Sequence, residues 1–375
     1  MRLLLVSPLP PPVGGIATWT QSVINYFKDS SEINITHIDS AVRWRRVQSN
    51  SIAMRLIGGS IQAIREYFKV KKILTKQKID VLHLCTSGSF SFYKDYLILK
   101  KCKELSIPTA LHIHMGRIEE ICNKKNWEFK ILQKCISTTD AVIVLDEKSL
   151  EAIVNKIGHK NINKVPNLLD DLIFNPVSQQ SEELIENNLV RLVFVGHITK
   201  KKGISDLVQA CSMLSECEFE LILIGPCDVS YRKELEEIAK KKNMGAWLKF
   251  SGTKDKQFVC QELMKSDIFL LPSYSEGFPL SLMEAMALRR AIIASNVGAI
   301  PEMLSIGSDE PCGICIESGN VQQLRIALLD LIGNPEKRNL LGKRAQNKVN
   351  EDYSTEAVIN KLTTIWNSKW SQNES

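Results

Sequence analysis

The sequence predicts an α/β protein made of two doubly wound domains, each a parallel sheet with helices on both faces. Short apolar runs alternate with segments of helical spacing, and this alternation occurs twice, before and after a polar stretch at 178–188. The length of 375 residues also exceeds what one hydrophobic core usually supports. Such domains bind ligands at the carboxyl ends of their strands, so two of them facing each other would form a cleft.

The first half of the chain contains five apolar runs of strand length. We expect strands at Arg2–Val6, Ile33–Ile38, Val81–Leu84, Thr109–Ile113 and Ala141–Val144, with helices between them. A polar, acidic stretch without periodicity then follows, which is typical of an interdomain linker. The first domain is therefore predicted over residues 1–180.

The second half repeats this alternation and closes with helices. Strands are expected near Arg191–Val195, Glu220–Ile224, Leu248–Phe250, Ile268–Leu271, Ala291–Ala294 and Gly313–Ile316. Helical spacing occupies Ile204–Leu214, Tyr231–Lys242, Val321–Ile332, Pro335–Val349 and Thr355–Trp370. We place the second domain at 188–354 and expect the closing helix, about 355–375, to pack back on the first domain.

The composition is that of an ordinary globular protein. The longest apolar runs fall far short of the roughly 20 residues that a membrane-spanning helix needs. The apolar start is too short for a signal peptide and runs into prolines, so it fits a buried first strand better. Ten cysteines follow no repeated spacing, and the single C-x-x-C pair, Cys312 and Cys315, has no second pair or histidine partner. These features predict a cytoplasmic protein with reduced cysteines.

The net charge of +6 is concentrated in one segment. Residues 42–76 carry nine Lys or Arg and a single acid, Glu66, together with apolar residues partly at helical spacing. A basic amphipathic helix of this kind can lie on an anionic membrane surface. The alternative is a solvated helix that packs its apolar stripe on its own domain.

The sharpest motif is the run from Ser275 to Ala287, which follows a buried strand and opens a helix. Pro279 is expected in the first helical turn, where a missing N–H is tolerated. The amides of Leu280 and Ser281 would then point out of the positive end of the helix, which favours an anion. Glu276 in the loop and Glu284 inside the helix could both face one ligand, at different depths.

The run from Glu276 to Ala287 resembles the E-x7-E motif of GT-B glycosyltransferases of family 4. Further segments resemble motifs of the same family: the glycine loop Gly14–Ile16, the pre-linker motif Val165–Asp170, the strand-and-lysine loop Val193–Gly203 and the turn Val297–Glu302. The resemblance implies the GT-B fold and the retaining transfer of a hexosyl or related unit from a nucleoside diphosphate sugar to a hydroxyl acceptor.

The resemblance also assigns roles in the second domain. Lys202, selected over its neighbours Lys200 and Lys201, would stabilise the leaving diphosphate as a point charge. Glu276 would bind donor sugar hydroxyls, and Glu284 the ribose. The donor-binding set is completed by Gly196, Gly277, Phe278, Leu280, Ser281 and His197. His197 is a departure, because the family usually has Arg at this position, and Arg is always charged and binds phosphate bidentately.

Two segments of the first domain complete the predicted site. Gly14 and Gly15 follow a stiff proline run and let backbone amides approach a phosphate or sugar closely. Strand alternation puts His112 and His114 on one face of a strand. The resemblance places the active-site histidine, in contact with the donor sugar, at His114. His112 is expected to be a core or supporting histidine.

No cofactor and no metal ion are expected. The sequence has no acidic pair placed after a strand to hold a divalent ion against a diphosphate. A nicotinamide dehydrogenase would need G-x-G-x-x-G after a strand, which does not occur. The expected partners are a nucleotide-sugar donor, a glycan or lipid-linked acceptor and an anionic membrane, but no nucleic acid. UDP is expected as the nucleotide because it is frequent in the family. The alternatives are a GT-B sugar-nucleotide epimerase and a non-catalytic membrane-docking protein of the same fold.

Overall fold

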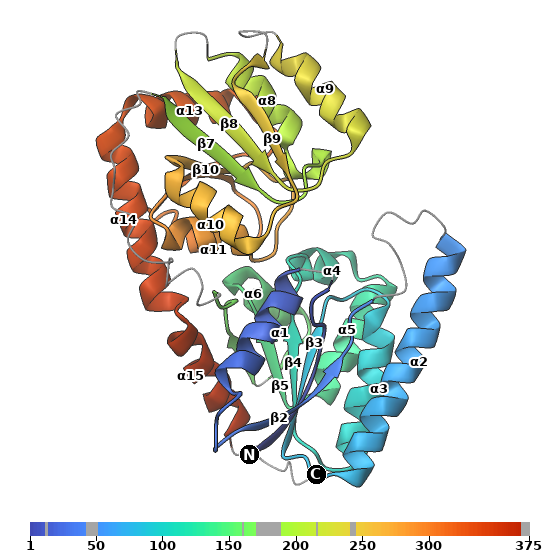
Figure 1. Ribbon diagram of the computed structural model, residues 1–375. Helices are drawn as coiled ribbons and strands as arrows, with labels where there is room; N and C mark the ends of the chain where they lie inside the picture. Colours follow the sequence, from blue (N-terminus) through green and yellow to red (C-terminus); the bar gives the residue numbers. More distant parts are fainter. Residues whose placement is uncertain are drawn as a thin grey trace. The chain divides into compact units, whose positions relative to one another are not determined.

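The computed structural model describes residues 1–11, 14–42, 52–159, 161–169, 189–214, 217–240 and 245–368, with the backbone alone for 52–57. The chain divides into two compact units, drawn in Figure 1. The first unit comprises 1–170 and 355–375, and the second comprises 171–354. The predicted linker at 178–188 lies outside the described residues.

The first unit is built on a six-stranded parallel sheet in the order β2-β1-β3-β4-β5-β6. Five strands match the predicted runs: β1 (Arg2–Ser7), β2 (Asn34–Asp39), β3 (Val81–Thr86), β4 (Thr109–Ile113) and β5 (Ala141–Val144). The sixth, β6 (Ile162–Lys164), was not predicted, because three half-buried residues at a sheet edge carry no apolar pattern.

Helices cover both faces of this sheet (Figure 1). One face packs against α2 (Ile52–Lys76), α3 (Ser91–Glu104), α4 (Ile118–Lys124), α5 (Trp127–Thr138) and α6 (Glu147–Lys156). The other face packs against α1 (Gly15–Tyr26) and the last helix, α15 (Thr355–Trp366). Alternation along each strand supplies both cores, so that Leu4 faces one and Leu3 and Leu5 face the other.

The second unit contains another six-stranded parallel sheet, in the order β12-β11-β10-β7-β8-β9. Its strands are β7 (Val190–Val195), β8 (Phe219–Ile224), β9 (Leu248–Gly252), β10 (Ile268–Leu271), β11 (Ala291–Ser295) and β12 (Ile314–Ile316). The central strands β7, β8 and β10 are almost wholly buried, as expected for a parallel sheet covered on both faces.

Helices again connect the strands of the second unit. They are the short 3-10 helix η1 (Lys200–Lys202), α8 (Ile204–Ser212), α9 (Val229–Ala239), α10 (Lys256–Lys265), α11 (Leu280–Ala287), α12 (Ile300–Met303), α13 (Val321–Gly333) and α14 (Pro335–Asp352). Two doubly wound α/β units are thus confirmed. Among the described helices, none is both long enough and apolar enough to cross a bilayer.

Candidate functional site

The loop after β7 lies against the loop after β10, its neighbour in the sheet. Gly203 closes η1 with a φ of +66°. A Cβ at this position would lie 1.9 Å from the carbonyl oxygen of Pro272, so only glycine allows the approach. The amide of Tyr274 donates to the carbonyl oxygen of Lys201 at 3.0 Å. The sheet edge therefore holds Lys202 and the loop before α11 next to each other.

Lys202 and Glu276 form an ion pair at this edge. The Lys202 Nζ donates to Glu276 Oε1 at 2.6 Å, and the Ser273 hydroxyl donates to the same oxygen at 2.7 Å. The Glu276 side chain is 9% exposed and the Lys202 side chain 29%. Two of the predicted catalytic residues, 74 positions apart in sequence, thus lie in direct contact, with the ammonium group still open to solvent.

A second turn fixes the backbone of Glu276 and Gly277. Gly298 has a φ of +56°, and a Cβ there would lie 2.2 Å from the carbonyl oxygen of Glu276. The amide of Ala299 donates to the carbonyl oxygen of Gly277 at 3.0 Å. The turn after β11 therefore supports the loop that carries Glu276, which gives the Val297–Glu302 motif a structural role.

The helix α11 begins one residue later than predicted. Pro279 is its N-cap and not a residue of its first turn, because its ψ of 116° is extended. Leu280 and Ser281 are the first two helical residues, and the amides of a first turn have no acceptor inside the helix. Both residues are partly exposed, so these amides can serve an anion.

Glu284 lies in α11 and is 7% exposed. Its carboxylate forms an ion pair with Lys256, the first residue of α10. Phe278 is buried as well, and its ring meets that of Tyr353 edge to face, with centroids 5.4 Å apart. This packing gives Phe278 a structural role in addition to any contact with the donor.

His197 and Gly196 follow β7. Gly196 has a φ of +149°. A Cβ on Gly225 would lie 1.9 Å from the carbonyl oxygen of Gly196. The loops after β7 and β8 thus approach each other closely through glycine backbone. His197 is exposed beside them.

In the first unit, Gly14 and Gly15 form the start of α1. Gly14 is the N-cap, with extended backbone, and its carbonyl oxygen accepts from the amide of Thr18 at 2.9 Å. A Cβ on Gly14 would meet nothing within 4 Å. Among the described residues, open space therefore adjoins Gly14 at the start of α1, the first helix after β1.

His114 lies one residue beyond β4, and its amide donates to the carbonyl oxygen of Thr86 at 2.9 Å. Its side chain is partly exposed, yet both ring nitrogens are buried. Burial lowers the pKa of His114 to about 3, against the opposing effect of the neighbouring Asn167 side chain. The ring is therefore neutral at pH 7 and can only act as a hydrogen-bonding group, not as a cation.

Two aromatic side chains, His112 and Trp19, contact this histidine. The ring centroids of His112 and His114 are 3.8 Å apart. The ring of Trp19, on α1, packs against those of His83, His112 and His114, with centroid distances of 5.1 to 5.3 Å. His112 is fully buried, as expected. His83 was missed because only the register of β3 against β4 brings it to His112. Trp19 was missed because it reaches these rings only through the packing of α1 on the sheet.

Two contacts of the second unit were also missed. Lys256 pairs with Glu284 from 28 positions away, and Ser273 lies three positions before Glu276. A lysine in a solvated helix gives no local signal of such a partner. Ser273 could have been found from the sequence, since a hydroxyl shortly after a buried strand lies at the ligand edge of a parallel sheet.

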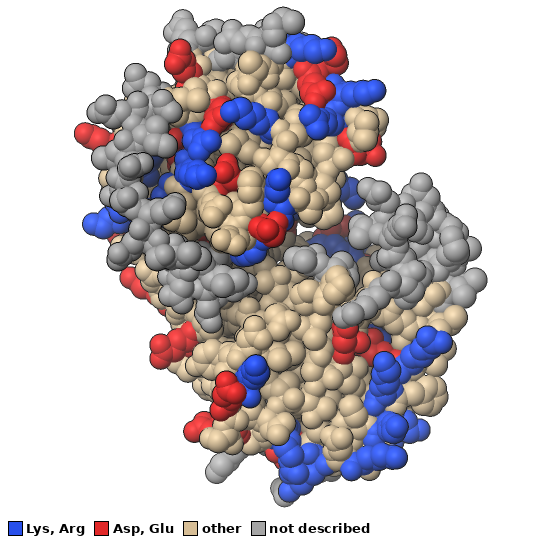
Figure 2. All heavy atoms as spheres, in the orientation of Figure 1, with Lys and Arg blue, Asp and Glu red and all other residues tan. Residues whose placement is uncertain are grey.

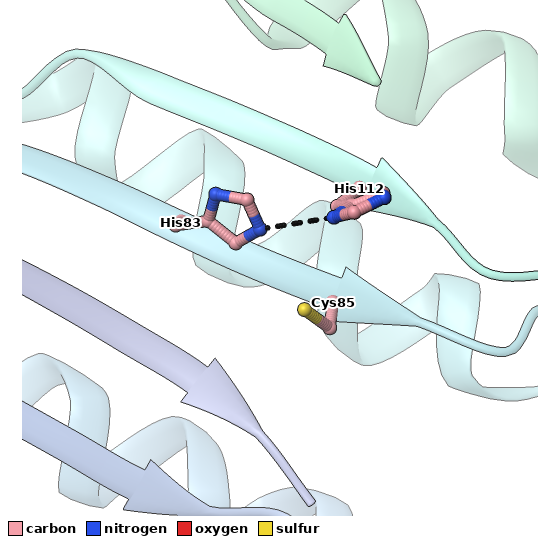
Figure 3. A group of neighbouring side chains, drawn as sticks. All are labelled: His83, Cys85 and His112. Atoms are coloured by element: carbon pink, nitrogen blue, oxygen red, sulfur yellow. Dashed lines mark hydrogen bonds between the residues drawn. The ribbon is translucent and has the colours of Figure 1, made fainter. Parts of the chain in front are cut away.

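Among the described residues, one group has the spacing to hold a metal ion: His83, Cys85 and His112, whose candidate ligand atoms all lie within 4.8 Å of one another (Figure 3). The Trp366 indole donates to His83 Nδ1 at 3.0 Å. A neutral His83 that accepts there carries its proton on Nε2, so neither nitrogen offers a lone pair to a metal. This hydrogen bond opposes metal binding.

Comparison with known proteins agrees with this geometry. Residues 178–348 match the family model described as glycosyl transferases group 1. The chain carries a group 1 glycosyltransferase domain. That domain includes Lys202, Glu276 and Glu284, so the ion pairs at the sheet edge lie within its matched residues.

Two curated relatives extend the glycosyltransferase likeness beyond this domain. An uncharacterised glycosyltransferase of Methanocaldococcus jannaschii is 25% identical over 351 residues, which is 92% of each chain. The N-acetyl-α-D-glucosaminyl L-malate synthase of Bacillus anthracis is 28% identical over 304 residues, which is 80% of this chain and 77% of the synthase.

Among solved structures, Anabaena HepE in complex with UDP superposes with a TM-score of 0.69 at 15% identity, over 97% of this chain and 98% of HepE. At this identity the likeness concerns the fold. Together with the two six-stranded parallel sheets, it confirms the GT-B fold class of the glycosyltransferase.

Proposed function

We propose that the protein is a retaining glycosyltransferase of family 4 that transfers a sugar from a nucleoside diphosphate sugar, with UDP as the nucleotide, to a hydroxyl acceptor. The observation that carries the proposal is the contact of Lys202, Glu276 and Ser273 beside the start of α11. It joins a cation, a carboxylate and first-turn amides at the ligand edge of a parallel sheet, which matches the chemistry of a diphosphate-linked sugar.

In this proposal the donor redistributes an existing ion pair. A diphosphate bound at Lys202 and at the amides of Leu280 and Ser281 becomes the stronger partner of the ammonium group, because it carries more negative charge than a carboxylate. Glu276, still held by Ser273, then accepts hydrogen bonds from sugar hydroxyls. Glu284 accepts from the ribose hydroxyls, with Lys256 orienting its carboxylate.

The proposed reaction takes place on one face of the sugar. The bond between the anomeric carbon and the diphosphate oxygen breaks, the acceptor oxygen forms the new bond on the same side, and the acceptor proton passes to the leaving diphosphate. Lys202 and the α11 amides stabilise the charge that develops on the diphosphate, and the neutral His114 hydrogen-bonds the sugar. The α-linkage in the name of the Bacillus anthracis relative is the one that retention gives from an α-linked donor.

The test is to incubate purified protein with UDP-sugars and a panel of hydroxyl acceptors. We expect release of UDP that depends on acceptor, an anomeric proton signal of unchanged configuration in the product, and full activity in EDTA. An epimerase would convert the donor without acceptor, and a non-catalytic protein would release no UDP. Loss of turnover in EDTA, restored by magnesium or manganese, would contradict the metal-independent mechanism.

We also propose a cytoplasmic location, with the first unit lying on an anionic membrane that carries the acceptor in bacterial surface polysaccharide or lipid-linked glycan assembly. All ten cysteines are free, which suits a reducing compartment. On α2, Ile61, Ile64 and Phe68 are 47%, 57% and 59% exposed, at a spacing that lines one helix face. Other apolar residues of α2, such as Val70, pack into the core, so the exposed stripe is separate from the packing stripe.

Cations accompany this stripe. The only acid of the 42–76 segment, Glu66, is turned inward and accepts from Lys94 at 2.5 Å. The exposed charges on the described part of α2 are therefore all positive: Arg65, Lys69, Lys71, Lys72 and Lys76. Figure 2 shows Lys and Arg gathered over α2. Such a charge balance favours anionic lipid by about 1 kcal/mol for each cation near the surface.

A second exposed group, of aromatic side chains, lies at the starts of α3 and α5 in the same unit. Trp127 stacks on Phe90 at 5.0 Å and on Tyr93 at 6.0 Å, and the three side chains are 42 to 64% exposed. Aromatic side chains of this kind favour the interface between lipid headgroups and acyl chains.

Vesicle sedimentation tests this membrane surface. We expect binding to vesicles with 30% phosphatidylglycerol and weak binding to phosphatidylcholine alone. The pair Ile64→Ser and Phe68→Ser should reduce binding, whereas the equally exposed Ile326→Ser of α13 should not. Equal binding by all variants would overturn the assigned surface without touching the transferase proposal.

A further inference from the structure

Three buried side chains from α15, β3 and β4 form a hydrogen-bonded chain in the first unit. The Trp366 indole N–H donates to His83 Nδ1 at 3.0 Å, and His83 Nε2 lies 3.3 Å from His112 Nδ1 (Figure 3 shows the second contact). Trp366 is 1% exposed and both histidines are fully buried. The chain thus runs through a dry interior, where each hydrogen bond is strong and an unmade one is costly.

The indole fixes the direction of every bond in this chain. Its nitrogen can only donate, so His83 Nδ1 must accept and the proton of His83 must be on Nε2. His83 then donates to His112 Nδ1, and His112 in turn carries its proton on Nε2. Burial lowers the pKa of His83 to about 3 and that of His112 well below its usual value, so both rings stay neutral and keep one tautomer each. Turning either ring by 180° would break the chain.

The fixed ring of His112 contacts the predicted active-site histidine. The centroids of His112 and His114 are 3.8 Å apart, with the ring planes 36° from parallel. Trp19 packs against the edges of both rings, at 5.1 and 5.2 Å. The Asn167 side chain also neighbours His114. The rings of His112 and Trp19 pack directly against His114 and therefore restrict its orientation.

We propose that Trp366, His83 and His112 are positioning residues: the indole sets both tautomers, and the fixed His112 ring holds His114 in the orientation that receives the donor sugar. The inference rests on the proposed function for the role of His114. It gives α15 a part in the active site as well as in the core, because Trp366 belongs to that helix.

The decisive variant is Trp366→Phe, which keeps an aromatic ring and removes the donor. We expect kcat for sugar transfer to fall about 3- to 10-fold, the loss of one neutral hydrogen bond, with the affinity for UDP unchanged because UDP is assigned to the second unit. The matched control is Phe27→Leu. Phe27 packs on the Trp366 ring at 5.8 Å, so this variant loosens the same packing and keeps the N–H.

Histidine ring nitrogens report the tautomers directly. In protein labelled with ¹⁵N-histidine, long-range ¹H–¹⁵N spectra should show His83 and His112 protonated at Nε2, assigned by His83→Gln and His112→Gln. Trp366→Phe should change the His83 signals and Phe27→Leu should not. An Nδ1-protonated His83 in the wild-type protein, or equal kcat for the two variants, would overturn the inference. Wild-type protein that transfers no sugar would instead defeat the proposed function and the role of His114, while the spectra still decide the tautomer chain.

Discussion

Each of the two glutamates of the E-x7-E motif is paired with a lysine. Glu276 contacts Lys202 and Glu284 contacts Lys256, and both carboxylates are nearly buried. Removing a carboxylate from water is costly unless a cation and hydrogen bonds compensate the loss of solvation. The two lysines therefore compensate the burial of two acceptors at the edge where we propose that the donor binds.

Lys202 is the first residue to test. Lys202→Ala removes the charge proposed to stabilise the leaving diphosphate, and we expect kcat to fall by about 100-fold or more and UDP binding to weaken. Steady-state kinetics and calorimetry measure the two effects. The control is Lys201→Ala, in the same loop, whose side chain is exposed. Similar kinetics for both variants would show that the loop does not hold the diphosphate.

The two glutamates should separate by the part of the donor that each binds. Glu284→Gln should weaken UDP binding about 10- to 150-fold, since the ribose loses a charged acceptor worth roughly 1.5 to 3 kcal/mol. Glu276→Gln should leave UDP binding intact or slightly tighter, because it releases Lys202, while transfer falls. Calorimetric titration of both variants with UDP decides. The opposite pattern would reverse the two assignments.

At the scale of the element, the site depends on close approaches that only glycine permits. Gly203 at the end of η1 lies against the Pro272 carbonyl, and Gly298 lies against that of Glu276. Both have positive φ, so a side chain would add backbone strain to a clash with backbone. The turns hold the two charged residues of the site in place.

Gly203→Ala should lower the free energy of unfolding by about 3 kcal/mol or more, since it combines positive-φ strain with a contact at 1.9 Å. Gly252→Ala is the matched control. Gly252 also has a positive φ, +69°, but a Cβ there would meet nothing within 4 Å, so only strain of roughly 1 to 2 kcal/mol is expected. Urea unfolding of both variants measures the difference, and equal losses would refute the close approach.

The elements that the sequence predicted well are those whose signal is local. The runs at Ala141–Val144 and Ile268–Leu271 are apolar throughout, and Thr109–Ile113 has apolar residues at three of its five positions. The strands β4, β5 and β10 have those bounds. The edge strand β6 has no such run and was missed. The E-x7-E motif likewise located a loop and helix, but not the start of the helix, because Pro279 is allowed both in a first turn and as the N-cap.

Partners distant in sequence could not be predicted in this way. Lys256 of α10 meets Glu284 of α11 from 28 positions away, and His83 meets His112 only through the register of β3 on β4. Trp366 lies 283 positions from His83, and its hydrogen bond exists because α15 returns to the first unit. Periodicity shows which face of an element is apolar, but not which polar residues will meet across two elements.

At the scale of the whole molecule, the chain places its buried titratable groups unevenly. The three neighbouring histidines His83, His112 and His114 all belong to the first unit, where the cluster adjoins Trp19, Trp366 and Cys85. Burial lowers the pKa of each ring and also raises that of the Cys85 thiol, so this interior is neutral at pH 7. Acid lowers the free energy of unfolding of such a protein, because these histidines bind protons in the unfolded chain at pH values where they do not in the folded chain.

The stability of the protein should therefore fall steeply below pH 6.5. For a histidine with a pKa of 6.5 when unfolded and about 3 when folded, the contribution is present above pH 6.5 and is lost as the pH falls toward 3. Between pH 7.5 and pH 5 the loss is about 2 kcal/mol for each such ring.

Urea unfolding of the wild-type protein and of His83→Gln at both pH values isolates one ring, because carboxylates contribute equally to both proteins. The variant should lose about 2 kcal/mol less stability on acidification, whereas His197→Gln, an exposed control, should behave as the wild type. Identical pH dependence in wild type and His83→Gln would mean that His83 takes up a proton at pH 5 in the folded protein. That result would contradict the hydrogen bond in which His83 Nδ1 accepts from the Trp366 indole.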